Sequence, residues 1–239
     1  MRKIISIAII ALIVPLFSAS WIMAPVNSGA PVQSAPSSTC TQRFTDDFDR
    51  SNRDIDGDNG WTTLAGSAAI SSNALVAGAS GTYVGSGTDF TAATQYWKVE
   101  MTTFVSTNVM GALFRSDVDG APAYSVYANT TDTTWDDGAT VQSASIGLSN
   151  GNTVGRMVTG TGNDTVIGLW VNPTNDKPFS GGPACTVTST PCWDDADDAP
   201  DTTFTNNPAT AADAYTSFAL FLDASGMTMD NLFYGDCSD

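Results

Sequence analysis

The sequence predicts an all-β protein that folds as a two-sheet antiparallel β-sandwich. From residue 41 onward, short runs of alternating apolar and polar residues follow one another, which is typical of strands with one buried face. Turn-forming pairs such as Asp119-Gly120 and Asp137-Gly138 separate these runs. No long stretch has the spacing of an amphipathic helix. Together these features favour a sandwich or jelly roll over a helical or mixed fold.

The expected strands are the alternating runs between turn signals. In chain order they are Arg43–Asp49, Trp61–Leu64, Ala74–Ala77, Thr82–Gly85, Tyr96–Val105, Val109–Arg115, Ala123–Ala128, Thr140–Gly147, Thr153–Thr159, Thr165–Asn172, Tyr215–Asp223 and Met227–Tyr234. The stretch Pro173–Ala214 is rich in Pro, Asp and Thr and has little alternation, so we expect a long loop there.

The same alternation assigns side chains to faces. In YWKVEMTTFV, Trp97 and Val99 fall on one side of the strand, and Lys98 and Glu100 fall on the other. The first pair is apolar and the second is charged, so we expect Trp97 in the core. Trp61 opens another alternating run and is assigned to the core in the same way.

The N-terminus resembles an export signal. A basic start at Arg2 and Lys3 precedes the apolar run Ile4–Phe17, and small residues follow up to Ser20. We expect a signal peptide over residues 1–20, which makes the protein secreted or displayed at the cell surface. Cleavage after Ala24 or Ala30 is an alternative, and so is an uncleaved signal anchor.

A linker separates this signal from the folded part. Residues 21–39 consist largely of Pro, Ser, Ala and Gly beyond the end of the apolar run, and they bring too little apolar surface to order the chain. The remaining residues, 40–239, are enough for one domain with a substantial core. We therefore expect a single jelly-roll domain over 40–239.

Charge and composition exclude several functions. The chain has 9 basic and 25 acidic residues, a net charge of −16, so nucleic acids and anionic membrane surfaces are excluded as partners. Contact with a membrane remains only through an uncleaved anchor. No histidine is present, which excludes His-dependent triads and His-ligated zinc. Glu100 is the only glutamate. The oligomeric state cannot be read from the sequence.

Four cysteines in an exported chain suggest two disulfides, with three possible connectivities. We favour Cys40–Cys237, which joins the two ends of the domain, and Cys185–Cys192, which closes the short loop CTVTSTPC. The longer closure stabilises more in the chain-entropy treatment, by about 4–5 kcal/mol. A four-cysteine zinc site is disfavoured because no Cys-x-x-Cys spacing occurs.

Three segments resemble a known family. They are the opening FTDDFDR…GWTTLAGSAAISSNALVAG, the middle TVGRMVTGTGNDTVIGLWVNPT and the end MTMDNLFYGD. They are similar to laminin-G-like, concanavalin A-like lectin-glucanase jelly-roll domains over nearly all of 42–236. The resemblance implies that the first and last strands are neighbours, which supports the Cys40–Cys237 pairing. It also implies glycan-related functions, from lectins and binding modules to hydrolases. The Glu-x-Asp-x-x-Glu strand of family 16 hydrolases has no counterpart, so no catalytic residue carries over.

An acidic loop suggests a metal site. Asp54, Asp56 and Asp58 alternate in DIDGDNG, and carboxylate oxygens on a glycine-bearing loop suit calcium. No glutamate follows at the twelfth position, so an EF-hand is disfavoured and a simpler calcium loop is expected. The alternative is a solvated turn in which the aspartates bind nearby amides. A second acidic segment, Trp193–Asp201, allows the same two interpretations.

Two tryptophan–aspartate pairs are candidates for sugar binding. Trp135 with Asp136 falls in an expected turn, and Trp193 with Asp194 falls in the expected long loop. Aromatic faces stack on pyranose CH groups, and carboxylates accept hydroxyl protons. Trp170 is a further candidate on the face of its strand away from the core.

These features favour a non-catalytic module that binds a polysaccharide or surface glycan, with calcium-stabilised loops. The alternative is a structural or adhesive envelope protein that acts through protein contacts. A less favoured alternative is a glycosidase or lyase that pairs Glu100 with Asp117 or Asp119.

Overall fold

The computed structural model describes residues 39–116, 124–136, 141–160, 165–173, 200–206 and 216–238. All of them belong to one compact unit, Ala35–Asp239. They form strands and loops and contain no helix, so no described helix could span a membrane. The predicted all-β class is confirmed.

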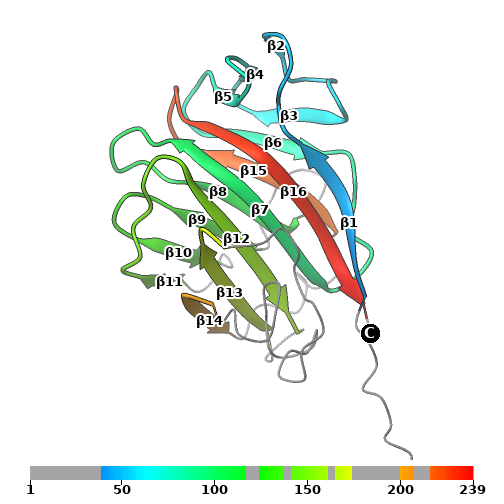
Figure 1. Ribbon diagram of the computed structural model, residues 1–239, viewed down its shortest axis with the longest axis vertical. Coiled ribbons are helices and arrows are strands. Elements are labelled where there is room, and N and C mark those ends of the chain that lie inside the picture. Colours follow the sequence, from blue (N-terminus) through cyan, green and yellow to red (C-terminus); the bar gives the residue numbers. More distant parts are fainter. Residues whose placement is uncertain are drawn as a thin grey trace, which may run out of the picture. The chain divides into compact units, whose positions relative to one another are not determined.

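Two antiparallel sheets make up the fold (Figure 1). The larger sheet has nine strands in the order β14-β13-β12-β7-β16-β5-β4-β2, and β1 also pairs with β16. Its strands are β1 (Thr39–Asp46), β2 (Arg53–Asp54), β4 (Ala68–Ile70), β5 (Leu75–Ala77), β7 (Thr94–Thr103), β12 (Asn152–Thr159), β13 (Thr165–Val171), β14 (Thr202–Asn206) and β16 (Thr228–Ser238).

The second sheet has seven strands in the order β11-β10-β9-β8-β15-β6-β3. Its strands are β3 (Trp61–Ala65), β6 (Thr82–Ser86), β8 (Met110–Ser116), β9 (Tyr124–Ala128), β10 (Thr133–Asp136), β11 (Val141–Ala144) and β15 (Ser217–Leu222). Neighbouring strands often come from distant parts of the sequence, as in β8 beside β15 and β7 beside β16. This non-local pairing is typical of jelly-roll sandwiches.

The core lies between the two sheets and follows the predicted alternation. Trp97 and Val99 on β7 are fully buried, and they share one hydrophobic cluster with Val84 on β6 and Leu220 on β15. Trp61 belongs to the same cluster, as predicted. Apolar side chains from both sheets therefore interdigitate, which is the arrangement that gives a β-sandwich most of its stability.

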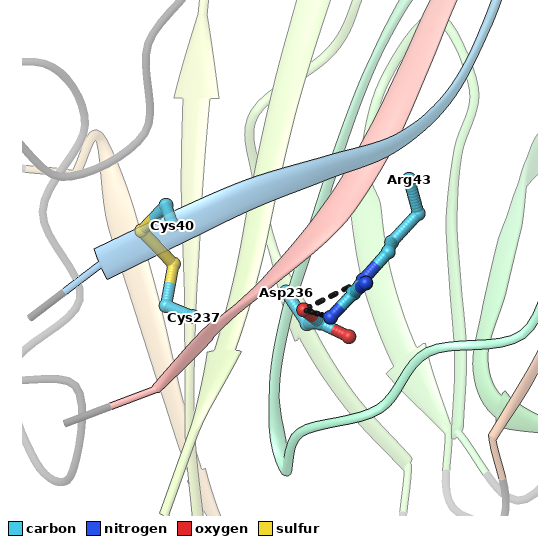
Figure 2. The surroundings of a disulfide bond; sticks show 4 residues. All are labelled: Cys40, Arg43, Asp236 and Cys237. Atoms are coloured by element: carbon cyan, nitrogen blue, oxygen red, sulfur yellow. Dashed lines mark hydrogen bonds and ion pairs between the residues drawn. A yellow bond between two sulfur atoms is a disulfide. The ribbon is translucent and has the colours of Figure 1, made fainter.

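The first and last strands are neighbours, and a disulfide joins them. Cys40 on β1 lies directly opposite Cys237 on β16, and the two are bonded across 197 residues of sequence. Figure 2 shows Arg43 and Asp236 on the same two strands, with Arg43 Nε donating to Asp236 Oδ1 at 3.0 Å. The backbone amide of Ala92 also donates to Asp236, at 3.2 Å. The predicted Cys40–Cys237 disulfide is confirmed.

The structure adds strands that the sequence prediction missed. β10 forms where a turn was expected, and β14 forms inside the stretch predicted as a loop, so both predictions were wrong at those positions. Thr133–Asp136 and Thr202–Asn206 are short and rich in Thr, and they gain their order from pairing with β9 and β13. The predicted signal peptide, most of the predicted linker and the Cys185–Cys192 pair lie outside the described residues.

Candidate functional site

A hollow of about 330 Å³ lies on the outward face of the seven-stranded sheet. The alternation on β9 defines this face, because Val126 and Ala128 belong to the core cluster and Tyr127 between them does not. Strands β6, β8, β9, β10 and β15 all contribute to the hollow. We call it the aromatic groove and define it by Tyr83, Tyr127, Asp136, Phe221 and Asp223.

Three aromatic rings line the groove because strand register places them at one level. Tyr83 lies opposite Phe221, and Phe221 lies opposite Gly111, which in turn lies opposite Tyr127. The rings of Tyr83 and Phe221 pack with centroids 4.6 Å apart at an interplanar angle of 32°. A Cβ at Gly111 would collide with the carbonyl oxygen of Val126, so this position accepts only glycine. No side chain therefore separates Phe221 from Tyr127 at this level.

Two carboxylates complete the lining. Asp136 ends β10 opposite Ser125, one row along the sheet from Tyr127. Asp223 follows β15, and its backbone amide donates to the carbonyl of Val109 at 3.0 Å. Asn108 Nδ2 donates to Asp223 Oδ2 at 3.3 Å, which orients that carboxylate. The groove thus offers fixed hydrogen-bond acceptors beside apolar ring faces.

The tyrosine hydroxyls are held in their protonated form. Burial raises the pKa of Tyr83, and the charge of Asp223 raises it further. Burial likewise raises the pKa of Tyr127, with added contributions from Asp136 and Tyr83. Both hydroxyls are therefore donors at neutral pH, and they supplement the carboxylate acceptors.

The chemistry of the groove suits a neutral, hydroxyl-rich ligand. Ring faces can stack on the CH groups of a sugar, carboxylates can accept from its hydroxyls, and the tyrosines can donate to them. No lysine or arginine occurs among the described lining residues. The described lining therefore favours a ligand that donates hydrogen bonds over an anionic one.

The structure moves the first predicted tryptophan site into the core. Trp135 lies on β10 and is 0% exposed, 6.5 Å from the ring of Phe204. The predicted turn was wrong, because these residues form the short strand β10 next to the edge strand β11. The side chains of Thr133 and Trp135 share the buried face of this strand. A ring without exposed surface cannot stack on a sugar in this conformation. Asp136, the other half of that prediction, does line the aromatic groove.

Other predicted tryptophan sites do not join the groove. Trp193 and Asp194 lie outside the described residues. Trp170 is on the face of β13 away from the main core, as predicted, but it is 1% exposed. It packs in a separate buried cluster with Tyr96 and Met157. No sugar platform forms at Trp170 in this conformation.

The side chains of the predicted calcium loop are engaged with protein groups. Asp58 accepts from Arg50 Nε at 2.6 Å, Asp54 accepts from the amide of Asp56 at 3.0 Å, and Asp56 accepts from the amide of Thr63 at 2.9 Å. Among the described residues, no three His, Cys, Asp or Glu side chains form a group that could hold a metal ion. The cations beside Asp58 are the guanidinium groups of Arg50 and Arg53, at 2.6 and 3.5 Å. The arrangement matches the solvated-turn alternative, and calcium binding stays a prediction.

Asp46 organises the loop from inside. It is 3% exposed and accepts from Arg50 Nη1 at 2.5 Å, from Trp61 Nε1 at 2.7 Å and from the amide of Phe48 at 2.8 Å. Burial alone would raise the pKa of Asp46, but the hydrogen bonds from Arg50, Trp61, Phe48 and Asn59 outweigh it and lower the pKa. Asp46, the first aspartate of the FTDDFDR segment, is thus a structural anchor.

Of the residues proposed for catalysis, Glu100 lies in the described part of the chain. Asp117 and Asp119 lie outside the described residues. Glu100 accepts from Asn231 Nδ2 at 3.0 Å and lies opposite Asp230 across β7 and β16. Burial raises the pKa of Asp230 to about 6, with Glu100 and other carboxylates adding to the effect. These carboxylates are on the nine-stranded sheet, so they do not belong to the aromatic groove.

Sequence reasoning missed most of the aromatic groove. Tyr83, Tyr127 and Phe221 occupy the non-core positions of their strands, where a solvated strand would carry polar side chains. An aromatic residue at such a position was the available signal. Its meaning depends on register, because only the cross-strand pairing brings the three rings to one level.

Comparison with known proteins supports the fold. No family model matches the chain, and the curated proteins give no match. Among solved structures, an endo-1,3-β-glucanase from Streptomyces sioyaensis has a TM-score of 0.51 at 13% identity, covering 84% of this chain and 99% of its own. A pseudo β-1,3-glucanase of Mycobacterium tuberculosis has a TM-score of 0.48 at 12% identity, covering 81% and 95%. The carbohydrate-binding module CBM66 from Bacillus subtilis has a TM-score of 0.44 at 11% identity, covering 75% and 94%.

These likenesses establish architecture and nothing finer. The neighbours are jelly-roll β-sandwiches of the concanavalin A-like kind, in agreement with the two antiparallel sheets of this chain. At 13% identity the likeness to the glucanase shows the fold alone. The other two structures have TM-scores below 0.5 and support no conclusion. Function has to be argued from the groove itself.

Proposed function

We propose that this protein is a non-catalytic glycan-binding module whose site is the aromatic groove. The single observation that carries the proposal is the set of three rings, Tyr83, Tyr127 and Phe221, beside Asp136 and Asp223 on an outward sheet face. Aromatic rings are expected to be covered on such a face, and a sugar ring is a ligand of suitable shape and chemistry to cover them.

The ligand class follows from charge. The chain carries a net charge of −16, and the described groove residues add two carboxylates and no cation. The net charge of the chain would repel uronic acids and sulfated sugars at a distance. Neutral glycans are therefore the proposed ligands. The glucanase likeness makes β-1,3-glucan a sensible first probe among them, since that enzyme acts on this polymer.

A binding role is proposed over hydrolysis because of residue content. A glycosidase needs two carboxyl groups that flank the scissile bond with different protonation roles. The carboxylates of the groove are Asp136 and Asp223, and Asn108 holds Asp223 as a hydrogen-bond acceptor at 3.3 Å. The one glutamate, Glu100, lies on the other sheet. We therefore assign the groove carboxylates to hydroxyl binding. We expect no release of reducing ends from any polysaccharide that the protein binds.

Export is part of the proposal. The basic and apolar start of the chain supports a signal peptide over residues 1–20. The Cys40–Cys237 disulfide also supports an oxidising compartment, where such bonds persist. A secreted or surface-displayed protein would meet polysaccharides there.

The test is a titration of neutral oligosaccharides, with a β-1,3-glucan series first and mannan, xylan and cellulose fragments after it. Tyr127→Ala should weaken binding about five- to thirty-fold, because loss of the stacked ring removes on the order of 1–2 kcal/mol. Tyr127→Phe keeps the ring and should lose much less. Thr62→Ala, an exposed change on β3, is the matched control. If no neutral glycan binds, or if Tyr127→Ala binds as tightly as Thr62→Ala, the proposal is wrong.

A further inference from the structure

A second hollow, of about 390 Å³, lies on the outward face of the other sheet. On β7, Lys98 and Glu100 line it, whereas Trp97 and Val99 point into the core. β1, β12 and β16 complete the lining. We call it the second hollow and define it by Gln42, Lys98, Glu100, Thr153, Asn231 and Phe233.

The second hollow has an aromatic ring with a fixed position. Phe233 lies opposite Lys98 across β16 and β7, and the Lys98 ammonium lies 5.7 Å from the centre of the Phe233 ring. Tyr96 contacts the same ring edge-on, with centroids 6.3 Å apart. On the other side of Lys98 the register brings Gly155, which adds no side chain. An aromatic ring and an ammonium group therefore both line the hollow.

Polar groups beside the ring are fixed by a strand irregularity. The register of β16 against β7 shifts between Asp230 and Phe233, and Asn231 has a φ of 50° in this bulge. The bulge aims Asn231 Nδ2 at Glu100 Oε2, 3.0 Å away. Thr153 lies opposite Glu100 on the third strand of the row. The hollow thus offers donors from Lys98 and Asn231 as well as acceptors from Glu100, Asp46 and Asp47, whereas the described lining of the aromatic groove has no lysine or arginine.

The two hollows open in opposite directions. Each lies on the outward face of one sheet, and the shared core lies between them. One sugar chain bound in the aromatic groove could not reach the second hollow without passing around an edge of the sandwich. Separate glycan chains would therefore occupy the two faces.

We propose that the second hollow is a second site for neutral glycans, so that a single domain is bivalent and cross-links polysaccharide chains. The proposal rests on glycan binding as the function of the aromatic groove. Phe233 supplies the stacking face, Lys98 and Asn231 donate to sugar oxygens, and Glu100 accepts from a hydroxyl. Cross-linking of two chains by one domain raises retention on a polymer through effective concentration, without any new contact.

The test uses the full chain, a β-1,3-linked glucose hexasaccharide and a soluble β-1,3-glucan polymer. If a different neutral oligosaccharide binds in the first screen, its hexamer and polymer replace them. Calorimetric titration should give two hexasaccharides per chain, and the wild type should precipitate the polymer. Phe233→Ala should reduce the stoichiometry to one and abolish precipitation. Gln42→Trp places a large side chain in the hollow from an exposed position on β1. It should also reduce the stoichiometry to one and abolish precipitation, and it leaves the packed ring of Phe233 in place.

The variants separate this inference from the proposed function. One hexasaccharide per wild-type chain, lost in Tyr127→Ala and unchanged in Gln42→Trp, would refute the second site and leave the aromatic groove intact. Binding that survives Tyr127→Ala and is lost in Gln42→Trp would refute the aromatic groove and keep the second hollow. Absence of binding to every neutral glycan would refute both. A stoichiometry of one together with precipitation would indicate a monovalent dimer and also overturn the inference.

Discussion

Removal of the Asp46 carboxylate should lower the free energy of unfolding more than the loss of any other single charge near it in the opening segment of the domain. In Asp46→Ala, Trp61 Nε1 and the amide of Phe48 lose their acceptor, and the guanidinium of Arg50 loses a bidentate partner at 2.5 and 2.9 Å. Trp61 is fully buried, so its donor cannot turn to water. Breaking one half of a buried pair costs about 3–5 kcal/mol, and the partial exposure of Arg50, 21% of its side chain, places this case near 3 kcal/mol.

The measurement is urea unfolding followed by tryptophan fluorescence at pH 7, with Asp49→Ala as the control. Asp49 is exposed and adjacent to Phe48 in sequence, so its loss should cost less than about 0.5 kcal/mol. The pKa of Asp46 is lowered in the folded state, so its stabilising effect is complete above the unfolded value of 3.8 and disappears as pH falls through the lower folded value. The difference between wild type and Asp46→Ala should therefore shrink below pH 4. A loss under 1 kcal/mol at pH 7 would refute the anchoring role.

Three further changes test separate parts of the structure. Asp230→Asn should stabilise the protein by about 1 kcal/mol at pH 7 and have no effect below pH 4, measured by urea unfolding. The pKa of Asp230 is about 6 in the folded state and 3.8 in the unfolded state, so the charged form destabilises the fold as pH rises between these values. Equal effects at both pH values would contradict this. Replacing both Cys40 and Cys237 by serine should cost about 5 kcal/mol, since the bond closes a loop of 197 residues; an unchanged urea midpoint would show that the closure contributes nothing. Any rise in Tm between EDTA and millimolar calcium should be the same in wild type and Asp56→Asn, because Asp56 already accepts a hydrogen bond from the amide of Thr63. If wild type shows a calcium-dependent rise that Asp56→Asn lacks, Asp56 binds calcium and this prediction is wrong.

The sequence predicted the fold because the fold depends on alternation, which is a local property. Trp97 and Trp61 were assigned to the core from period-two spacing alone, and both are fully buried. The Cys40–Cys237 pairing could be predicted because it joins the ends of one domain. β14 could not be predicted, because Thr202–Asn206 has little apolar alternation and owes its order to pairing with β13.

The site was predicted less well because it depends on register. Trp135 and Asp136 are adjacent in sequence, yet one lies in the core and the other lines the aromatic groove, since consecutive strand residues face opposite ways. Tyr83 and Phe221 are far apart in sequence and form one ring pair only because β6 pairs with β15. No periodicity within a single strand carries that information.

Strand register also explains why both candidate sites use residues that look unremarkable in the sequence. A sandwich needs its core positions filled with apolar side chains, which leaves function to the outward positions of the same strands. In this chain the outward positions of β9 and β15 carry Tyr127 and Phe221, and those of β16 and β7 carry Phe233 and Glu100. These side chains lie outside the main core cluster, so changes on one face leave the packing between the sheets in place. Substitutions on one face should therefore alter that face's binding and leave the other face unaffected.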